Sequence, residues 1–257
     1  MNPPALELIS LEKTFPGPAG GAPVRALSGL SLTVGRGEYV SLLGESGCGK
    51  STLLALAAGL MRPDRGRVLC EGREVGGPDR HRMLMFQEDA LFPWLDVQDN
   101  VLYGLRFVPD LNRAQKLARA GEFLDLVGLG GFRRFRVHEL SGGMRQRAAL
   151  ARALAPDPDL LLMDEPFSAL DAMTREQLYA DLQRIWQATG KTVVMVTHNV
   201  REAVCLSDRV ALLGRGGRLI ADEPISLPYP RHMNDVSLAE TAGRLQSALK
   251  AGSGETE

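Results

Sequence analysis

The amino-acid sequence predicts an α/β protein with a mixed-sheet core, an antiparallel β subdomain near the N-terminus and an inserted α-helical subdomain. Three observations carry this prediction. Short apolar runs that end at glycine or at polar residues recur along the chain, as is typical of buried strands. Residues 5–11 and 27–34 alternate apolar and polar side chains, which indicates two antiparallel strands. Residues 112–127 instead repeat their apolar side chains with a helical period.

The expected elements follow one another along the chain. The first two strands are joined by the glycine- and proline-rich loop "PGPAGGAP" (16–23). "EYVSLL" (38–43) is a buried strand, and an apolar helix follows at 53–60. We expect further strands at 67–70, 83–86, 160–163, 192–197 and 210–213. After a proline break at Pro228, a weakly amphipathic helix is expected near 236–249, and the polar end 251–257 is expected to fray.

We expect most of the 257 residues to form one large domain over 5–225. Its core is expected to comprise 5–87 and 156–225, with the helical insert at roughly 88–155. Residues 226–257 are expected to form a C-terminal tail.

The composition is ordinary for a soluble globular protein, with 44% hydrophobic and 24% charged residues. The net charge is −1, whereas proteins that bind nucleic acid usually carry a net positive charge, so no nucleic-acid partner is expected. No secretory signal is expected, because "MNPPALELIS" (1–10) has no basic region followed by an apolar run. No apolar segment approaches the ~20 residues that cross a bilayer. Membrane association is therefore expected to go through a partner.

An odd number of cysteines without CxxC spacing indicates reduced thiols in a cytoplasmic compartment: Cys48, Cys70 and Cys205.

"GESGCGKST" (44–52) matches the phosphate-loop pattern GxxxxGK[ST] between a predicted strand and a predicted helix. The glycines let backbone N–H groups curl around a phosphate, and the helix N-terminus favours an anion. Lys50 is expected to bridge the β- and γ-phosphates, and the Ser51 hydroxyl to ligate Mg²⁺. This context favours a nucleotide site over a chance glycine turn. The expected nucleotide-binding residues are Gly44, Glu45, Ser46, Gly47, Cys48, Gly49, Lys50, Ser51 and Thr52.

Cys48 lies inside this loop, and for function its side chain is interpreted as a small filler. Its reactivity is a separate expectation. Lys50 and the helix N-terminus are expected to stabilise the thiolate, so Cys48 should react with a maleimide faster than the other two cysteines.

Two carboxylates follow the predicted strand in "LLLMDEP" (160–166). Asp164 is expected to hold Mg²⁺ through water, and Glu165 to act as the general base that polarises the attacking water. An Asp-Glu pair after an apolar run is often only a strand end that faces solvent. The phosphate loop in the same chain favours the catalytic interpretation.

Two further polar residues follow predicted strands. Because ligands of α/β sheets lie at the carboxyl ends of the strands, His198 is expected beside Lys50 and Glu165, hydrogen-bonded to the γ-phosphate. Gln87 is expected to ligate Mg²⁺ or the attacking water and to report nucleotide state. A structural histidine and an ordinary loop glutamine are the open alternatives.

A second glycine turn opens a predicted helix at "LSGGMRQ" (140–146). It has the architecture of an anion site but no lysine to hold a phosphate.

Over residues 5–225 the chain resembles the ATP-binding subunits of ABC transporters, whose motifs occur in the same order. These motifs are "GESGCGKST", Gln87, "LSGGMRQ", "LLLMDEP", "SALD" (168–171) and His198. The resemblance implies a P-loop NTPase core with a RecA-like mixed sheet, and an ATPase that uses ATP and Mg²⁺. Phe15 falls where the family places an aromatic that stacks on adenine. Tyrosine is more usual there, and a core phenylalanine is the alternative.

The resemblance also implies a head-to-tail dimer with a second ATPase subunit. The Ser141 hydroxyl and the Gly142 and Gly143 amides would then cap the γ-phosphate of ATP held by the partner, whose own Lys50 supplies the missing cation. Asp171 would contact the opposite subunit.

Segment 86–105 contains an apolar cluster, broken by a proline, that comprises Leu91, Phe92, Trp94 and Leu95. It is either part of the insert's own core or, as we prefer, a groove that receives a short helix of a multispanning membrane permease. Segments 86–101 and 206–231 are similar to the nitrate, sulfonate and taurine importer branch, although "GRGG" (214–217) stands where that branch more often has a proline-glycine pair.

The resemblance therefore implies an ATP-hydrolysing subunit of a bacterial importer for a small oxidised anion such as nitrate, sulfonate or taurine. It would lie peripherally at the cytoplasmic face of the inner membrane. A periplasmic or lipoprotein solute-binding protein would be an indirect partner. The alternative is a soluble ABC ATPase that acts on nucleic acid or ribosomes, and co-purification with a membrane protein would distinguish the two.

Overall fold

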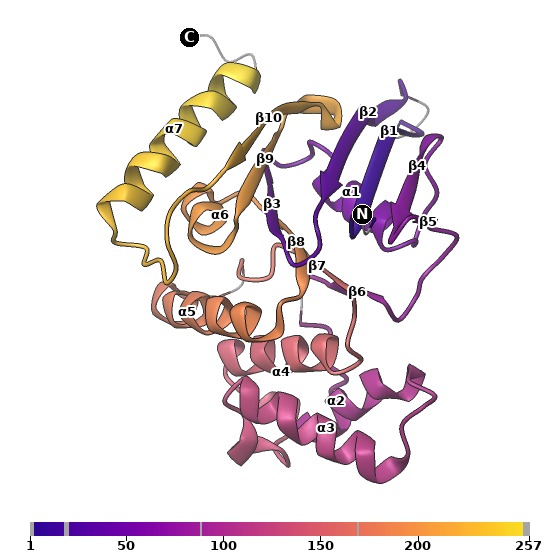
Figure 1. Cartoon of the computed structure of the whole chain (residues 1–257), viewed down its shortest axis with the longest axis vertical. Helices are drawn as coiled ribbons and strands as arrows, with labels where there is room; N and C mark the ends of the chain where they lie inside the picture. Colours follow the sequence, from indigo (N-terminus) through magenta and orange to yellow (C-terminus); the bar gives the residue numbers. More distant parts are fainter. Residues whose placement is uncertain (1–2, 18–20, 88, 169, 254–257) are drawn as a thin grey trace. The chain divides into compact units, whose positions relative to one another are not determined.

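The computed structural model describes residues 3–17, 21–87, 89–168 and 170–253. The chain divides into two compact units (Figure 1): a first unit of Met1–Pro78 with Thr192–Glu257, and a second unit of Asp79–Lys191. Within the described ranges, no helix is both long and apolar enough to cross a bilayer. The division into core and insert at 88 and 155 stays a prediction.

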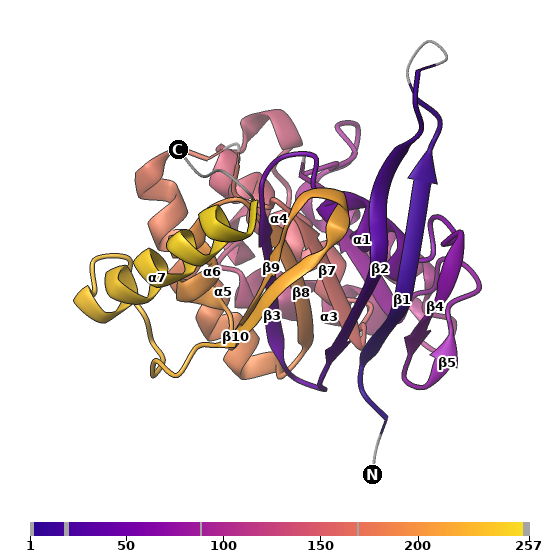
Figure 2. The same cartoon turned by 90° about the horizontal axis from the view of Figure 1, so that it is seen from above.

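The first unit contains an antiparallel sheet with the strand order β2-β1-β4-β5 (Figure 2). Strands β1 (Leu6–Phe15) and β2 (Val24–Val34) form the predicted antiparallel pair, and both run longer than the alternation indicated. The other edge of β1 pairs with β4 (Arg65–Cys70), which is followed by the short β5 (Arg73–Glu74). The alternating leucines of β1 are buried, so this sheet has an apolar face as predicted.

The first unit also contains four strands of mixed direction, in the order β10-β9-β3-β8. Strand β3 (Tyr39–Gly44) runs parallel to both β8 (Thr192–Thr197) and β9 (Arg209–Leu213), whereas β10 (Leu219–Pro224) is antiparallel to β9. Every residue of β3 and β8 is buried, as continuous apolar runs predict for central parallel strands. The mixed-sheet core is confirmed.

Helix α1 (Lys50–Ala57) starts three residues before the predicted helix at 53–60 and ends earlier. Its polar first turn is part of the phosphate-loop motif, so the apolar pattern begins only at Leu53. At the other end, Gly59 adopts a φ of 77° that terminates the helix. Helices α1 and α6 (Val200–Leu206) both contact β3 and β8.

The C-terminal tail is part of the first unit. Helix α7 (Val236–Ser253) extends beyond the predicted 236–249 and contacts α6, β9 and β10. Before it, the buried Arg231 guanidinium donates hydrogen bonds to backbone carbonyls that include Val204 and Ser207, both at 2.7 Å. These carbonyls lie near the C-terminal end of α6, where a cation complements the helix dipole. Of the end expected to fray, 254–257 lies outside the described residues.

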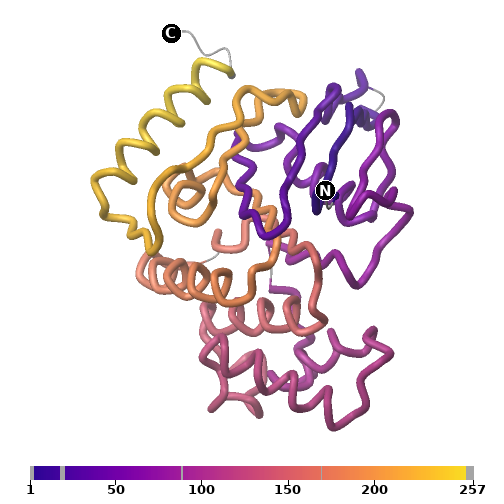
Figure 3. Tube along the Cα trace, in the orientation of Figure 1, coloured from indigo at the N-terminus to yellow at the C-terminus, as the bar shows by residue number. Residues whose placement is uncertain are grey.

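The second unit combines two parallel strands, β6 (Arg82–Met85) and β7 (Leu160–Asp164), with four α-helices in the described residues. The helices are α2 (Val97–Gly104), α3 (Arg113–Leu126), α4 (Gly142–Leu154) and α5 (Ala172–Thr189). The helix predicted over 112–127 is confirmed as α3, which begins with a capping box between Asn112 and Gln115. Helix α4 contacts α2, α3 and α5 and also β6, and its course beside α5 can be followed in Figure 3.

Candidate functional site

The phosphate-loop sequence forms the turn between β3 and α1. Strand β3 ends at Gly44, and α1 begins at Lys50. Between them, Gly47 and Gly49 adopt φ angles of 77° and 106°, in the left-handed region that favours glycine. The two glycines therefore permit the backbone curl that the motif predicts.

Strand β2 lies directly against this loop. A Cβ atom at Gly49 would stand 2.3 Å from the carbonyl oxygen of Ala26 and 3.1 Å from a methyl of Leu27. On the turn after β9, a Cβ atom at Gly217 would stand 2.6 Å from the same carbonyl oxygen. Both positions therefore exclude a side chain, and the backbone at Ala26 is held between the loop and the "GRGG" turn.

Lys50 is 5% exposed, and its ammonium lies under the loop. Nζ donates hydrogen bonds to the carbonyl oxygens of Gly44 at 2.7 Å and Glu45 at 2.8 Å. The two loop carbonyls replace water as hydrogen-bond acceptors for the ammonium. A buried ammonium without such acceptors would lower the stability of the folded protein. These bonds fix the lysine in the loop that the motif assigns to the phosphates.

The expectation of a stabilised Cys48 thiolate is wrong. The thiol is 3% exposed, and burial raises its pKa above the ordinary value. The Lys50 ammonium, whose Nζ lies 4.0 Å from Sγ, lowers the pKa by less than burial raises it. All three cysteines are buried, so Cys48 is not set apart by access either.

His198 lies beside the phosphate loop within the first unit. Leu43 of β3 pairs in parallel register with Thr197 of β8. Gly44 and His198 each follow their paired residue by one position, so both lie at the carboxyl ends of neighbouring strands. The His198 side chain is exposed, which fits a residue that meets a ligand better than a buried structural histidine.

Phe15 is the last residue of β1, and its ring is half-buried. Its register partner is Val24, two residues before the Ala26 that touches Gly49. The Lys13 ammonium lies 5.8 Å from the ring centroid and is itself held by Asp64 at 2.8 Å. The partly open ring favours the adenine interpretation over a core phenylalanine, and the assignment stays a prediction.

In the second unit, the ends of β6 and β7 bring three predicted residues together. Met85 pairs in parallel register with Met163. Gln87 and Glu165 each follow by two positions, and Asp164 lies between Met163 and Glu165. Gln87 is exposed, and both carboxylates are partly exposed. The amide and the carboxylates thus lie at one edge of this strand pair.

The backbone at Glu165 is unusual for a residue with a side chain, because its φ is 42°. Such a conformation costs of order 1–3 kcal/mol and persists only where neighbouring groups hold it. The Ser168 backbone N–H and hydroxyl both donate to the Glu165 carbonyl oxygen, at 3.2 and 3.0 Å. Ser168 therefore supports the backbone at the predicted general base.

Ser141 is the exposed N-cap of α4, and its hydroxyl oxygen accepts a hydrogen bond from the Met144 N–H at 3.2 Å. Gly142 and Gly143 form the first turn, where backbone N–H groups lack helical partners. A serine hydroxyl and free amides at a helix N-terminus are suited to bind an anion. The second glycine turn thus has the predicted architecture.

Asp171 caps α5 in the same way. It is exposed, and Oδ1 accepts a hydrogen bond from the Thr174 N–H at 3.0 Å. Hydrogen bonds from Thr174 hold the Asp171 pKa below its ordinary value, so the carboxylate stays charged at the start of the helix. Ala169 of the "SALD" turn lies outside the described residues.

The apolar cluster after Gln87 divides between core and surface. Leu91 is buried, as the core interpretation requires, whereas Trp94 is 69% exposed. Phe92 is half-buried, with its ring centroid 5.4 Å from that of Trp94 and 4.4 Å from that of Tyr103. The sequence pattern could not separate these roles because all four residues are apolar.

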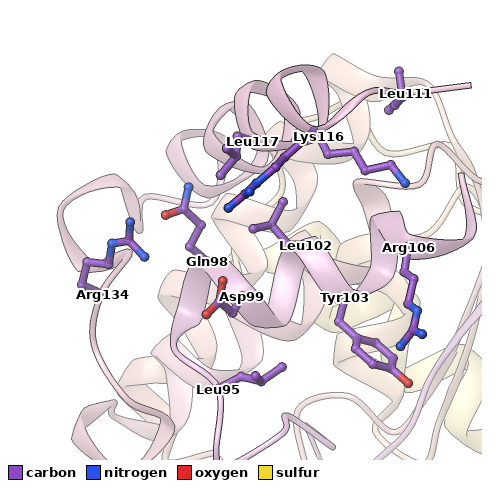
Figure 4. Close-up of a pocket in the computed structure, with 11 residues that line it drawn as sticks. Leu95, Gln98, Asp99, Leu102, Tyr103, Arg106, Leu111, Lys116, Leu117 and Arg134 are labelled. Carbon is purple, nitrogen blue, oxygen red and sulfur yellow. The ribbon is translucent and has the colours of Figure 1, made fainter.

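Beside this cluster, the second unit has a cleft of about 660 Å³ lined by α2, α3 and the segments next to them (Figure 4). Leu102 of α2 and Leu117 of α3 line it with Leu95, and Tyr103 and Arg106 lie at one end. The cleft is partly apolar with basic side chains at its edges. The sequence predicted a groove in this region, and Leu95 is the residue shared by the predicted cluster and the cleft.

Two polar residues beside the site received no role from the sequence. Ser168 supports Glu165, as described above, and Gln146 of α4 donates a hydrogen bond to the Pro166 carbonyl. Both lie inside quoted motifs, but only the folded chain shows their partners. The sequence did contain one signal for Gln146, because the residue falls on the buried side of a predicted helix. A buried amide needs a hydrogen-bond partner, so this position indicates a polar contact inside the protein.

Comparisons with known proteins agree with this geometry. Residues 27–168 match the family described as "ABC transporter". The chain is 53% identical over 197 residues to the taurine import ATP-binding protein TauB of Burkholderia pseudomallei (strain 1710b), covering 76% of this chain and 75% of that protein. It is 45% identical over 237 residues to the nitrate import ATP-binding protein NrtC of Synechococcus elongatus, covering 92% of this chain and 36% of that protein.

A solved structure has the same fold. The dimeric post-hydrolysis state of the ATP-binding cassette MJ0796, bound to ADP and Pi, superposes with a TM-score of 0.74 at 32% identity. The match covers 87% of this chain and all of that chain. With the phosphate loop and the strand-end carboxylates, these likenesses settle the family. The chain belongs to the ABC transporter family, as an ATP-binding subunit that hydrolyses ATP.

Proposed function

We propose that this ATPase powers a bacterial importer for a small oxidised anion such as nitrate, a sulfonate or taurine. The observation that carries the proposal is the likeness, over three quarters or more of the chain, to relatives named for taurine and nitrate import. In this proposal the chain lies peripherally at the cytoplasmic face of the inner membrane. A multispanning permease and a periplasmic or lipoprotein solute-binding protein select the solute.

ATP binding is assigned to the first unit. The phosphate loop, Gly44 to Thr52, wraps the phosphates with its backbone N–H groups, and Lys50 exchanges its loop carbonyls for the β- and γ-phosphates. Phe15 stacks on the adenine. The buried position of Lys50 supports this role, because a cation shielded from water attracts phosphate more strongly than an exposed one.

Mg²⁺ is assigned to Ser51, Gln87 and Asp164. The described residues contain no cluster of three or more His, Cys, Asp or Glu side chains that would hold a metal. The three residues would supply a hydroxyl, an amide and a carboxylate oxygen. So few protein ligands are typical of Mg²⁺ that is also bound by nucleotide phosphates. The ion would neutralise charge on the β- and γ-phosphates.

Hydrolysis is assigned to Glu165 as the general base, with Gln87 and His198 beside the γ-phosphate. Glu165 takes a proton from the attacking water, and the strained backbone at Glu165 aims the carboxylate. His198 donates a hydrogen bond to the γ-phosphate, and its exposure at the carboxyl end of β8 supports that contact. Gln87 positions the water or the ion.

In this proposal, a second ATPase subunit binds at the N-terminal turn of α4. The Ser141 hydroxyl and the Gly142 and Gly143 amides cap the γ-phosphate of ATP bound by the partner, and Asp171 contacts that partner. The dimeric state of the related cassette MJ0796 supports this arrangement. The absence of a lysine from the "LSGGMRQ" turn also fits, because each phosphate already has the lysine of the chain that binds it.

In this proposal, the permease binds the face that carries Trp94 and Phe92. A tryptophan that is 69% exposed beside a partly apolar cleft supports a helix-in-groove contact, since aromatic anchors dominate such interfaces. The basic edge of the cleft, with Arg106 and Lys116, favours a helix that carries acidic side chains.

The experiment that tests the proposal is uptake by intact cells of radiolabelled taurine, an alkanesulfonate and nitrate. The chromosomal gene is replaced by a Glu165→Gln variant or by a Glu176→Gln control, which changes an exposed carboxylate on α5. We expect Glu165→Gln to abolish uptake of one solute class and the control to retain it. Unchanged uptake of all three solutes would refute the importer assignment.

A further inference from the structure

Gln146 is a buried side chain of the helix that follows the "LSGG" turn. It is 5% exposed, and its Nε2 donates a hydrogen bond to the carbonyl oxygen of Pro166. The residues around the amide are mostly apolar and include Leu150, Phe167 and Leu178. In such surroundings a hydrogen bond is stronger than in water, and the loss of one partner leaves the other unsatisfied.

Helix α4 touches the same downstream segment at two further points. A Cβ atom at Gly142 would stand 3.2 Å from a methyl of Leu170, and one at Gly143 would stand 2.4 Å from a methyl of Thr174. The first turn of α4 therefore lies directly against residues 170–174. If α4 moves as one rigid element, a displacement of this turn reaches Pro166 through Gln146.

Pro166 directly follows Glu165, whose backbone conformation must be held by its neighbours. Ser168 holds the Glu165 carbonyl, and Gln146 holds the next carbonyl along the chain. Both hydrogen bonds hold the chain directly after the Glu165 Cα, where φ is 42°, and so support the backbone that carries the Glu165 carboxylate.

We propose that Gln146 is a positioning residue that couples the anion site of Ser141, Gly142 and Gly143 to Glu165 of the same chain. The inference rests on the proposed function, in which Ser141 meets the partner's phosphate and Glu165 is the general base. Gln146 supports Glu165 whether or not the partner carries ATP. Engagement of the partner's ATP by α4 strengthens this support, so that the base acts faster on the chain's own ATP, and a single site with an intact Gln146 keeps part of its activity.

The first test separates positioning from stability. Gln146→Met keeps the side-chain volume but removes the donor. We expect kcat to fall roughly 10- to 100-fold, the scale of a misplaced catalytic group, with the KM for ATP within about twofold. The matched control is Gln183→Met, which changes another buried glutamine of the second unit. A kcat for Gln146→Met no lower than that of the control would overturn the proposal.

A second variant guards against loss of folding. Gln146→Glu keeps the shape, and its carboxyl can donate to the Pro166 carbonyl only when protonated. Burial raises the pKa of a carboxyl group, so we expect kcat relative to the unmodified protein to recover as the pH is lowered towards 5. A purely structural role would give a ratio that does not depend on pH, and that result would contradict positioning.

The third test locates the effect in one subunit. Mixing Ser141→Arg subunits with Lys50→Ala subunits yields dimers with one intact site, formed by Lys50 and Glu165 of the first and Ser141 of the second. We expect Gln146→Met to lower the recovered ATPase rate when placed in the Ser141→Arg subunit, which supplies the working Glu165. In the Lys50→Ala subunit it should have little effect.

The outcomes separate the two hypotheses. Equal loss from either placement, or loss only in the Lys50→Ala subunit, would overturn the role of Gln146 while the shared site stands. If the mixture without the Gln146 change recovers no ATPase activity, the shared site of the proposed function fails, and the coupling that rests on it fails too.

Discussion

Leu43 of β3 and Thr197 of β8 are paired in parallel register, and this pair sets the phosphate loop and His198 side by side. His198→Ala should therefore lower kcat while ATP affinity stays within a few-fold, because the side chain is exposed and its proposed contact is with the terminal phosphate alone. Steady-state ATPase kinetics and equilibrium nucleotide binding measure this. His232→Ala, at another exposed histidine of the first unit, is the control. Equal kcat values for the two variants would remove His198 from the site.

Glu165→Gln should retain ATP binding and lose turnover by a factor of about 10²–10⁴, the usual contribution of a general base. The amide keeps the shape of the side chain but cannot take a proton from water. We also expect ATP to hold this variant as a dimer, which size-exclusion chromatography with and without ATP would detect. Hydrolysis at the unmodified rate would exclude Glu165 as the base.

Trp94→Ser should weaken assembly with the membrane subunit and leave thermal stability almost unchanged, within about 0.5 kcal/mol, because the side chain is largely exposed. Phe92→Ser should weaken assembly too, with an additional stability loss from its contact with Tyr103. Co-purification with the tagged permease and thermal unfolding measure the two effects. Leu60→Ser, at an exposed apolar residue of the first unit, is the control. A collapse of stability in Trp94→Ser would instead support the core interpretation.

Cys48 should react slowly with a maleimide near pH 7.5 in the folded protein. Burial raises its pKa above the ordinary value, so the reactive thiolate is scarcer than in a free cysteine, and burial also restricts access. Cys205 should be slow as well, because burial raises its pKa to about 12. Peptide mapping after brief labelling, compared with labelling in denaturant, measures all three cysteines. Fast, selective labelling of Cys48 in the folded state would contradict its burial.

The elements that the sequence predicted are those with strong local patterns. Strands β3 and β8 are short apolar runs, and parts of β1 and β2 alternate apolar and polar residues, so each was placed within a few residues. Helix α5 was not predicted, although it has 18 residues. Its signal was present in the Asp171 cap and in the helical spacing of Leu178, Leu182 and Ile185, which are buried.

What the sequence could not predict depends on tertiary surroundings. The predicted motifs named Glu165 and Ser141, but no local pattern shows that Gln146 reaches Pro166 or that Ser168 supports the Glu165 backbone. The Cys48 prediction failed for the same reason. The sequence shows that Lys50, which lowers the Cys48 pKa, is close to the thiol. It does not show that the folded chain buries the thiol, and burial raises the pKa by more than Lys50 lowers it.

The most direct test of the account is the ATPase rate of a mixture of Lys50→Ala and Ser141→Arg subunits, each inactive alone. Head-to-tail pairing places both lesions in one site and leaves the other intact, so the account predicts that activity reappears on mixing and scales with the fraction of mixed dimers. Mixed dimers that form, as shown by co-purification of two different tags, yet stay as inactive as either parent would contradict it.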